Sequence, residues 1–182
     1  MNISQDLWKR LATSLKGTVN APVNQRPPDF DYLSTDTRTL HGSDETLAHT
    51  VFIALRGPRH DGHAHVAAAA AAGVQGFILA SDWSGEDPEG HVLRVPNTLA
   101  ALQALGRTAR LSRSGKVVGI TGSNGKTTVK EWAHALTPSA HRISKSPGSW
   151  NSQVGVPLSR WGMDDKAEPY WVAAGMAAPG EL

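Results

Sequence analysis

A glycine-rich segment followed by lysine and threonine is the part of this sequence best suited to chemistry. The segment GITGSNGKTTVKEW covers residues 119–132. A glycine-rich turn that leads straight into a helix N-terminus points several backbone N–H groups at one place, and this arrangement suits a phosphate chain. Lys126 would place positive charge on the β and γ phosphates, and the Thr127 hydroxyl is a hard oxygen ligand for Mg²⁺. We therefore predict an ATP and Mg²⁺ site at Gly122, Ser123, Asn124, Gly125, Lys126, Thr127 and Thr128, with Thr127 as the metal ligand.

The spacing of the glycines differs from the common phosphate-loop pattern G-x-x-x-x-G-K-[ST]. The residue six positions before Lys126 is Ile120, and the glycines are Gly119, Gly122 and Gly125. The segment could therefore also be a glycine-rich turn that only connects a strand to a helix. The Lys-Thr-Thr that follows the turn favours phosphate binding.

The elements around this segment predict an α/β protein. Leu7, Leu11 and Leu15 recur at helical spacing, whereas residues 50–55, 74–80 and 91–95 have the composition of buried strands. An alanine-rich helix ends at Gly73, and Asn97 can cap a helix that runs to about Arg113. The alternation of strands and helices indicates an α/β fold.

A second α/β series follows a break at SRSGK, residues 112–116. We predict two domains, residues 1–113 and residues 114–182. The second contains a strand at 116–121, a helix from Lys126, a helix at about 158–163 and a strand at 170–175.

Composition excludes several other classes of protein. Eighteen Lys and Arg against 16 Asp and Glu provide no electrostatic case for binding nucleic acid. The longest apolar run is far shorter than the roughly 20 residues of a membrane span. The absence of cysteine fits a cytoplasmic protein.

The glycine-rich segment TGSNGKTT, residues 121–128, resembles the phosphate loop of the Mur ligase family. These ATP-dependent enzymes add amino acids to the UDP-linked peptidoglycan precursor. Residues 34–40 (STDTRTL), 51–79 and 146–159 (SPGSWNSQVGVPLS) resemble further segments of the members that add D-alanyl-D-alanine. The resemblance covers about residues 30–182.

This resemblance implies a small N-terminal α/β domain that holds the UDP end of the precursor, followed by an incomplete P-loop ATPase α/β domain. It places six residues of the first domain near the UDP-linked muropeptide, and Asn151 near the nucleotide and the precursor phosphates. The six are Asp36, Thr37, Arg38, Asp61, Gly62 and His63.

The residues themselves leave alternatives open. Asp36 and Arg38 could form a local ion pair, and Asn151 could serve only to form a turn. His60, His63 and His65 could suggest a metal cluster, but they lack supporting ligands, and exposed loop histidines are the alternative that we favour.

Two departures from the family pattern bear on activity. Aligning the last ten residues with the family places Ala173 where a Mg²⁺-binding Glu is expected, and the chain ends at Leu182, before the family's amine site. We therefore expect an acid–D-amino-acid ligase by resemblance that is inactive alone, unless a separate chain supplies the remainder. A non-catalytic protein that binds a nucleotide, a UDP-sugar or a partner is the alternative, and an unrelated phosphate-loop kinase would require the upstream resemblance to be accidental.

Overall fold

The computed structural model describes residues 2–22, 28–138, 143–164 and 169–175. It divides into two compact units, Met1–Ala101 and Leu102–Leu182. The division falls inside helix α4 (Thr98–Leu111). The predicted domain boundary at 113/114 lies just after the end of that helix.

The first unit is built on a five-stranded sheet in the order β1-β5-β4-β3-β2. The strands β2, β3, β4 and β5 are parallel, and β1 runs antiparallel to β5. Every residue of β3 and β4 is buried, as expected for parallel strands covered on both faces. The bounds are β1 (Thr18–Asn20), β2 (Tyr32–Ser34), β3 (Thr50–Ile53), β4 (Gly76–Ala80) and β5 (His91–Val95).

Helices α1 (Gln5–Ser14), α2 (Asp44–Ala48) and α3 (Val66–Ala71) complete this unit, with short 3₁₀ helices η1 (Thr37–Thr39) and η2 (Gly62–His65). On one side of the sheet the buried side chains of α3 pack on Phe52 and Phe77. The Trp8 ring of α1 lies 5.4 Å from the Phe30 ring. These contacts hold the sheet rigid, so that the loops at its carboxyl edge have a fixed base.

Most predicted elements of the first unit are confirmed, but three short ones were missed. The sequence predicted α1, α3, β3, β4 and β5, and the Asn97 side chain caps α4 by accepting from the Ala100 N–H at 3.0 Å. It did not predict β1, β2 or α2. Strands of three residues are too short to show a period-two pattern, and their pairing with β5 and β3 decides them.

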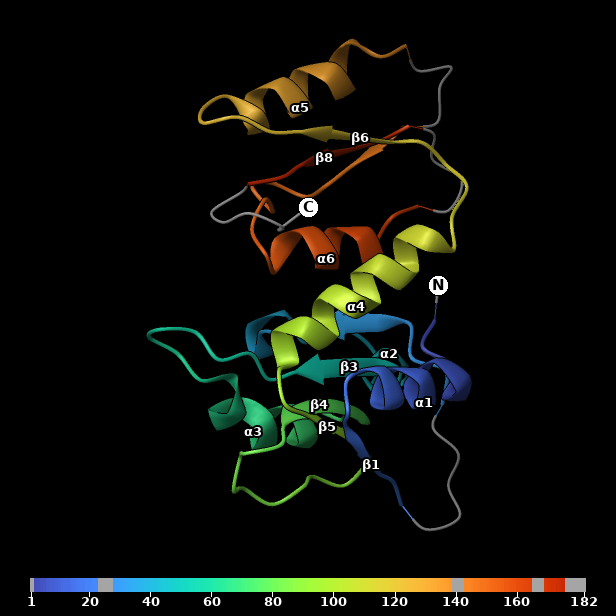
Figure 1. Ribbon diagram of the computed structural model, residues 1–182, viewed down its shortest axis with the longest axis vertical. Helices are drawn as coiled ribbons and strands as arrows, with labels where there is room; N and C mark the ends of the chain where they lie inside the picture. The colour runs from blue at the N-terminus through green and yellow to red at the C-terminus, as the bar shows by residue number, and fades with distance from the viewer. Residues whose placement is uncertain (1, 23–27, 139–142, 165–168, 176–182) are drawn as a thin grey trace. The chain divides into compact units, whose positions relative to one another are not determined.

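The second unit contains a parallel three-stranded sheet in the order β6-β8-β7 among its described residues. Its strands are β6 (Val117–Ile120), β7 (Ser144–Lys145) and β8 (Tyr170–Ala173). Helices α5 (Lys126–Leu136) and α6 (Gly155–Trp161) lie on opposite sides of this sheet (Figure 1). The carboxyl ends of the strands therefore share one edge, where the phosphate loop begins.

Helix α6 begins at Gly155, not near residue 158 as predicted, and ends at Trp161. The Gly155 N–H donates to the Ser152 hydroxyl at 3.1 Å, and this bond helps to start the helix before Pro157. Proline is tolerated in a first helical turn because the N–H it lacks would have no intrahelical acceptor there. Reading Pro157 as a loop residue caused the error.

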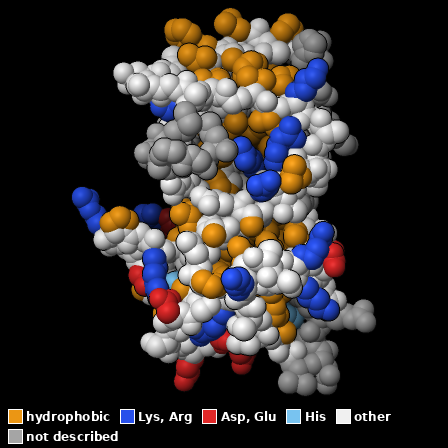
Figure 2. All heavy atoms as spheres, in the orientation of Figure 1, with side chains coloured by type: hydrophobic (Ala, Val, Ile, Leu, Met, Phe, Trp, Pro, Cys, Tyr) orange, Lys and Arg blue, Asp and Glu red, His pale blue; other side chains and the backbone are white. Residues whose placement is uncertain are grey.

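The outer face of α5 is apolar and exposed. Val129, Trp132 and Leu136 are 50%, 65% and 82% exposed. Their spacing places them on one side of the helix, and hydrophobic side chains gather over α5 in the space-filling view (Figure 2). The opposite side of α5 faces the sheet and carries the buried Lys130.

Candidate functional site

The loop between β6 and α5 has the backbone shape of a phosphate cradle. Gly122 and Gly125 have φ values of +142° and +78°, which side chains rarely adopt. Gly125 is the N-cap of α5 and provides no side-chain cap, so that no side chain of the cap residue occupies the first-turn N–H groups. The loop thus presents free backbone donors and the positive end of a helix dipole at one place.

Lys126 lies across this loop. Its Nζ donates to the carbonyl oxygens of Gly122 at 2.5 Å and Ser123 at 3.4 Å. The ammonium group is therefore held beside the loop by two backbone carbonyl groups. Thr127 is half-buried in the first helical turn, whereas Ser123, Asn124 and Thr128 are exposed.

The end of β8 lies beside the start of the phosphate loop. Ala173 pairs with Ile120, the last residue of β6, and the Ala174 N–H donates to the Ile120 carbonyl at 2.9 Å. The Gly175 N–H donates to the Asn151 carbonyl at 2.6 Å. This bond brings the half-buried Asn151, which is distant in sequence, to the same sheet edge as the phosphate loop.

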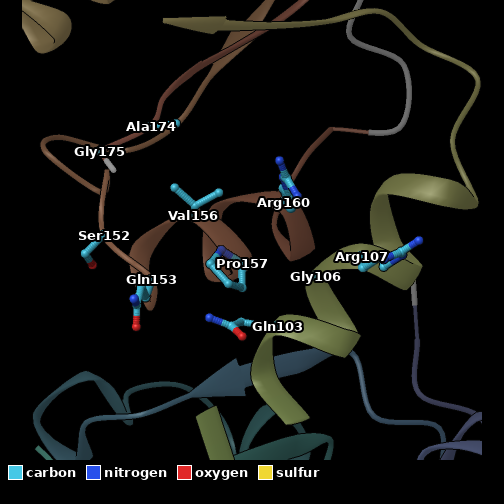
Figure 3. Close-up of a pocket in the computed structure, with 10 residues that line it drawn as sticks. All are labelled: Gln103, Gly106, Arg107, Ser152, Gln153, Val156, Pro157, Arg160, Ala174 and Gly175. Carbon is cyan, nitrogen blue, oxygen red and sulfur yellow. The ribbon is translucent and has the colours of Figure 1, made fainter. Parts of the chain in front are cut away.

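A pocket of about 210 Å³ lies on the α6 side of this edge (Figure 3). Gln103 and Arg107 of α4 and Arg160 of α6 lie around it, with the chain that follows Asn151. Burial and the charge of Arg110 lower the pKa of the Arg160 guanidinium. None of these residues was predicted from the sequence, because only the packing of α4 on α6 brings them together. The lining is Gln103, Gly106, Arg107, Ser152, Gln153, Val156, Pro157, Arg160, Ala174 and Gly175.

In the first unit, Asp36 and Arg38 follow β2 and form an ion pair. The Arg38 Nη2 lies 2.6 Å from Asp36 Oδ2, and Nε donates to both carboxylate oxygens at 3.0 Å. The Asp36 carboxylate also accepts from the Arg38 backbone N–H, and these bonds lower its pKa to about 2. The local ion pair is therefore present, and the Arg38 side chain remains 88% exposed beside Thr37 in η1.

Asp61, Gly62 and His63 form the turn into η2, and His63 corrects one expectation. His63 is 4% exposed, so it is not an exposed loop histidine. Its Nδ1 lies 2.5 Å from Asp61 Oδ1, and its Nε2 accepts from the Ala80 N–H at 3.0 Å. His60 and His65 are exposed, and among the described residues no three His, Cys, Asp or Glu side chains gather as a metal site.

Arg56, which was not predicted from the sequence, connects the loops after β3 and β4. Its Nη1 donates to both oxygens of Asp82 at 2.7 and 2.8 Å, and its Nε lies 3.4 Å from Asp61. Arg56 follows β3 and Asp82 follows β4, so this pair joins neighbouring strands at the carboxyl edge of the sheet. The signal was available, since a charged residue directly after a buried strand commonly lines that edge.

Both compact units of this chain resemble proteins of one family. Residues 120–179 match the model of the Mur ligase middle domain. A UDP-N-acetylmuramoyl-tripeptide–D-alanyl-D-alanine ligase from Bacillus subtilis is 37% identical over 175 residues, which is 96% of this chain and 36% of the relative. The corresponding enzyme from Borreliella burgdorferi is 30% identical over 83% of this chain and 34% of its own length. This chain is a Mur ligase homologue.

Solved Mur ligase structures extend the likeness to the whole fold. MurF from Acinetobacter baumannii superposes with a TM-score of 0.79 at 26% identity, covering 99% of this chain and 37% of that one. The MurF ligase from Thermotoga maritima in complex with ADP has a TM-score of 0.67 at 28% identity, over 82% of this chain and 33% of that one. The predicted α/β Mur ligase fold is therefore confirmed.

The Mur ligase relatives are much longer than this chain, which spans about a third of their length. The part that matches is the N-terminal portion, as predicted. No helix among the described residues has the length and apolar character needed to cross a bilayer.

Proposed function

We propose that this chain supplies the nucleotide-binding loop and the precursor-binding unit of an ATP-dependent ligase that adds D-alanyl-D-alanine to a UDP-linked muramoyl tripeptide. The phosphate cradle between β6 and α5, with Lys126 already lying across it, carries this proposal. The similarity to UDP-N-acetylmuramoyl-tripeptide–D-alanyl-D-alanine ligases supports the substrate class. The complex of the T. maritima relative with ADP supports the nucleotide.

In this proposal the phosphates of ATP occupy the loop that contains Gly122 and Gly125. The first-turn N–H groups of α5 bind the phosphate oxygens, and Lys126 moves from the loop carbonyls to the transferred phosphate. Ser123, Asn124 and Thr128 are exposed along the same loop and add polar contacts.

The residues beside the phosphate loop would bind Mg²⁺ through few protein ligands. The half-buried Thr127 hydroxyl is a suitable oxygen ligand, whereas Ala173, at the neighbouring strand end, offers a methyl group. Mg²⁺ commonly keeps several waters and binds through one or two protein ligands together with substrate phosphates. Thr127 would hold the ion, which would neutralise phosphate charge.

The reaction is a phosphoryl transfer followed by acyl transfer. The precursor carboxylate attacks the γ-phosphorus of ATP, ADP leaves, and the amine of D-alanyl-D-alanine displaces phosphate from the acyl phosphate. The task of this chain is to hold the nucleotide and the carboxylate in line, because alignment contributes much of the rate. Asn151, at the same sheet edge, is proposed to contact the precursor beside the γ-phosphate.

The UDP end is proposed to bind the carboxyl edge of the first unit's sheet. Arg38 presents an exposed guanidinium there, and Thr37 lies beside it at the start of η1. Asp36 orients Arg38, and Asp61, Gly62 and His63 shape the adjoining turn. A diphosphate matches an exposed guanidinium by paired hydrogen bonds.

Ala173 favours a second candidate function, nucleotide binding without ligation. A methyl group at the end of β8 cannot ligate Mg²⁺, so that this chain could retain the loop and its ligand while lacking part of the metal shell. A non-catalytic chain of this kind would bind a nucleotide, a UDP-sugar or a partner at the same two sites.

Calorimetry with Mg-ATP tests the nucleotide site. Replacing Lys126 with Ala should weaken binding about 10–100-fold, because a hydrogen bond to a charged group is worth about 1.5–3 kcal/mol. Lys116→Ala removes an exposed lysine just before β6 and should leave the affinity unchanged. Equal dissociation constants for the natural chain and Lys126→Ala would remove the assignment.

A further inference from the structure

Lys130 is a fully buried lysine in the second turn of the phosphate-loop helix. Its exposed fraction is 0%, and its Nζ donates to the carbonyl oxygens of Ser146 at 2.6 Å and Gly148 at 2.5 Å. The Glu131 carboxylate lies 3.3 Å from the same nitrogen. An ammonium group has three N–H donors, so these acceptors satisfy it completely and offset the cost of burying its charge.

The two carbonyl groups belong to one segment, residues 146–151, which we call the acceptor loop. It leaves β7 with the Ser146 N–H donating to the Trp171 carbonyl at 2.8 Å, and it turns at Gly148, whose φ is +40°. It ends at Asn151, whose carbonyl accepts from Gly175 at 2.6 Å. The loop is therefore fastened to β8 at one end and to Gly175, two residues beyond β8, at the other, and between them Lys130 attaches it to α5.

This attachment joins the acceptor loop to the helix that carries the nucleotide residues. Lys126 and Lys130 lie four residues apart in α5, about one turn or 6 Å along its axis. The pairing of Ala173 with Ile120 brings the Asn151 end of the loop to the strand that enters the phosphate loop. The strand order β6-β8-β7 places the phosphate loop and the acceptor loop at the same edge of the sheet, with only β8 between them.

We propose that Lys130 is a positioning residue that sets the acceptor loop against the phosphate loop, so that a group held at Asn151 and the terminal phosphate of the nucleotide are presented together. This inference rests on the proposed function. Lys130 itself does not reach the reacting atoms, because its three donors are used within the protein.

Glu131 also pairs with Lys145, and this second contact links α5 to β7. The Lys145 ammonium is ion-paired with Glu131, and this contact, with that of Lys130, lowers the pKa of the Glu131 carboxyl. Both side chains are about one-third exposed. Lys145→Met therefore breaks a neighbouring contact on the same helix without removing either bond to the acceptor loop, and it serves as the matched control.

Trp150 reports the position of the acceptor loop. It is 43% exposed and lies within the loop, and one of six ¹⁹F resonances of the 5-fluorotryptophan-labelled chain would be assigned to it with Trp150→Phe. In the natural chain, Mg-ATP should shift this resonance. Lys130→Met, which removes all three donors but keeps the length of the side chain, should move the Trp150 resonance without nucleotide and abolish its response to Mg-ATP.

The same variant should still bind Mg-ATP within about threefold of the natural affinity, because the loop amides and Lys126 remain. Lys145→Met should retain the natural resonance and response. If Lys130→Met does not fold, Lys130→Gln, which keeps two donors, should show a smaller displacement of the Trp150 resonance.

A folded Lys130→Met or Lys130→Gln chain with the natural Trp150 resonance and the natural Mg-ATP response would overturn the inference. A natural chain that does not bind Mg-ATP would contradict the proposed function and the coupling with it. Displacement of Trp150 without nucleotide would then still show that Lys130 holds the loop, and so the two failures are distinguishable.

Discussion

Lys126 and Ala173 occupy two positions of the proposed nucleotide site. The first is the position expected to bind phosphate, and the second is the position where a metal ligand is expected. Lys126 is held beside the loop by two carbonyl groups, whereas Ala173 is fully buried at the end of β8 and pairs with Ile120. Phosphate binding uses groups within a few residues of each other along the chain. By resemblance to the Mur ligase family, a second Mg²⁺ ligand is expected at the end of the neighbouring strand β8, where this chain has Ala173.

Replacing Ala173 with Glu should add a carboxylate ligand for Mg²⁺ next to the phosphate loop. Without ligand the variant should unfold at a lower temperature, because a carboxylate at this buried position has no partner. Mg-ADP should raise the melting temperature of Ala173→Glu more than ADP with EDTA does. Ala173→Gln has the same size without the charge and should show a smaller Mg²⁺ effect. The same Mg²⁺ effect in both variants would show that position 173 does not face the metal.

The Asp36 carboxyl group should make the free energy of unfolding depend on pH in the acidic range. The hydrogen bonds from Arg38 lower its pKa from the ordinary 3.8 to about 2 in the folded chain. A depressed pKa stabilises the folded state above the unfolded value, and this contribution is lost as the pH falls from about 4 to about 2. The carboxylate is about one-third exposed, so solvent screening keeps the contribution small.

Urea unfolding of Asp36→Asn at several pH values from 2 to 5 should therefore show a smaller loss of stability than the natural chain over this range. Glu86→Gln, which alters an exposed carboxylate, should follow the natural pH profile. Identical profiles for Asp36→Asn and the natural chain would remove the assigned role of the Asp36–Arg38 pair.

Close packing of α1, β3 and β4 positions the carboxyl edge of the first unit. Gly76 opens β4 between Val51 and His91, and a Cβ atom there would lie 2.8 Å from both the Phe30 ring and the Val51 side chain. The Phe30 ring in turn packs on Trp8 of α1. A change at Gly76 therefore disturbs the strand order that brings Arg56 and Asp82 together.

Gly76→Ala should lower the free energy of unfolding by about 1–3 kcal/mol, the usual cost of overpacking a filled core. Gly57→Ala is the control, since the nearest atom to its new methyl group would be 3.6 Å away and its backbone is in an ordinary conformation. The measurement is urea unfolding followed by circular dichroism. Equal stabilities of the two variants would mean that β4 can shift at little cost.

The proposed function assigns one ligand site to each of the two compact units. The first lies at the loops after β2, β3 and β4, and the second at the phosphate loop and the acceptor loop. Because a bound ligand stabilises the amide hydrogen bonds around its own site, hydrogen exchange can assign each ligand to a unit.

Mg-ADP should slow exchange in residues 119–136 and 146–151, whereas UDP should slow exchange in residues 35–38 and 54–63. Lys126→Ala should lose the effect of Mg-ADP and keep that of UDP. Protection of the same peptides by both nucleotides would contradict the division of roles between the units.

Local sequence was sufficient for the glycine-rich turn between β6 and α5 and for the longer elements. A glycine-rich turn, a lysine and a helix start lie within ten residues, so their geometry follows from backbone rules. Buried strands such as β4 are recognisable in the sequence by their continuous apolar composition. The family was also readable from these segments, and the comparisons confirm it.

Contacts between distant residues were decided by packing, which no short stretch of sequence contains. The burial of His63 depends on the Ala80 N–H, the strands β1 and β2 exist through pairing with β5 and β3, and the acceptor loop is held by Lys130. Each of these joins residues that are 16 or more positions apart or lie in different strands. A lysine on a helix is ordinarily solvated, and only the three acceptors around Nζ make Lys130 stable inside the protein and give it a role.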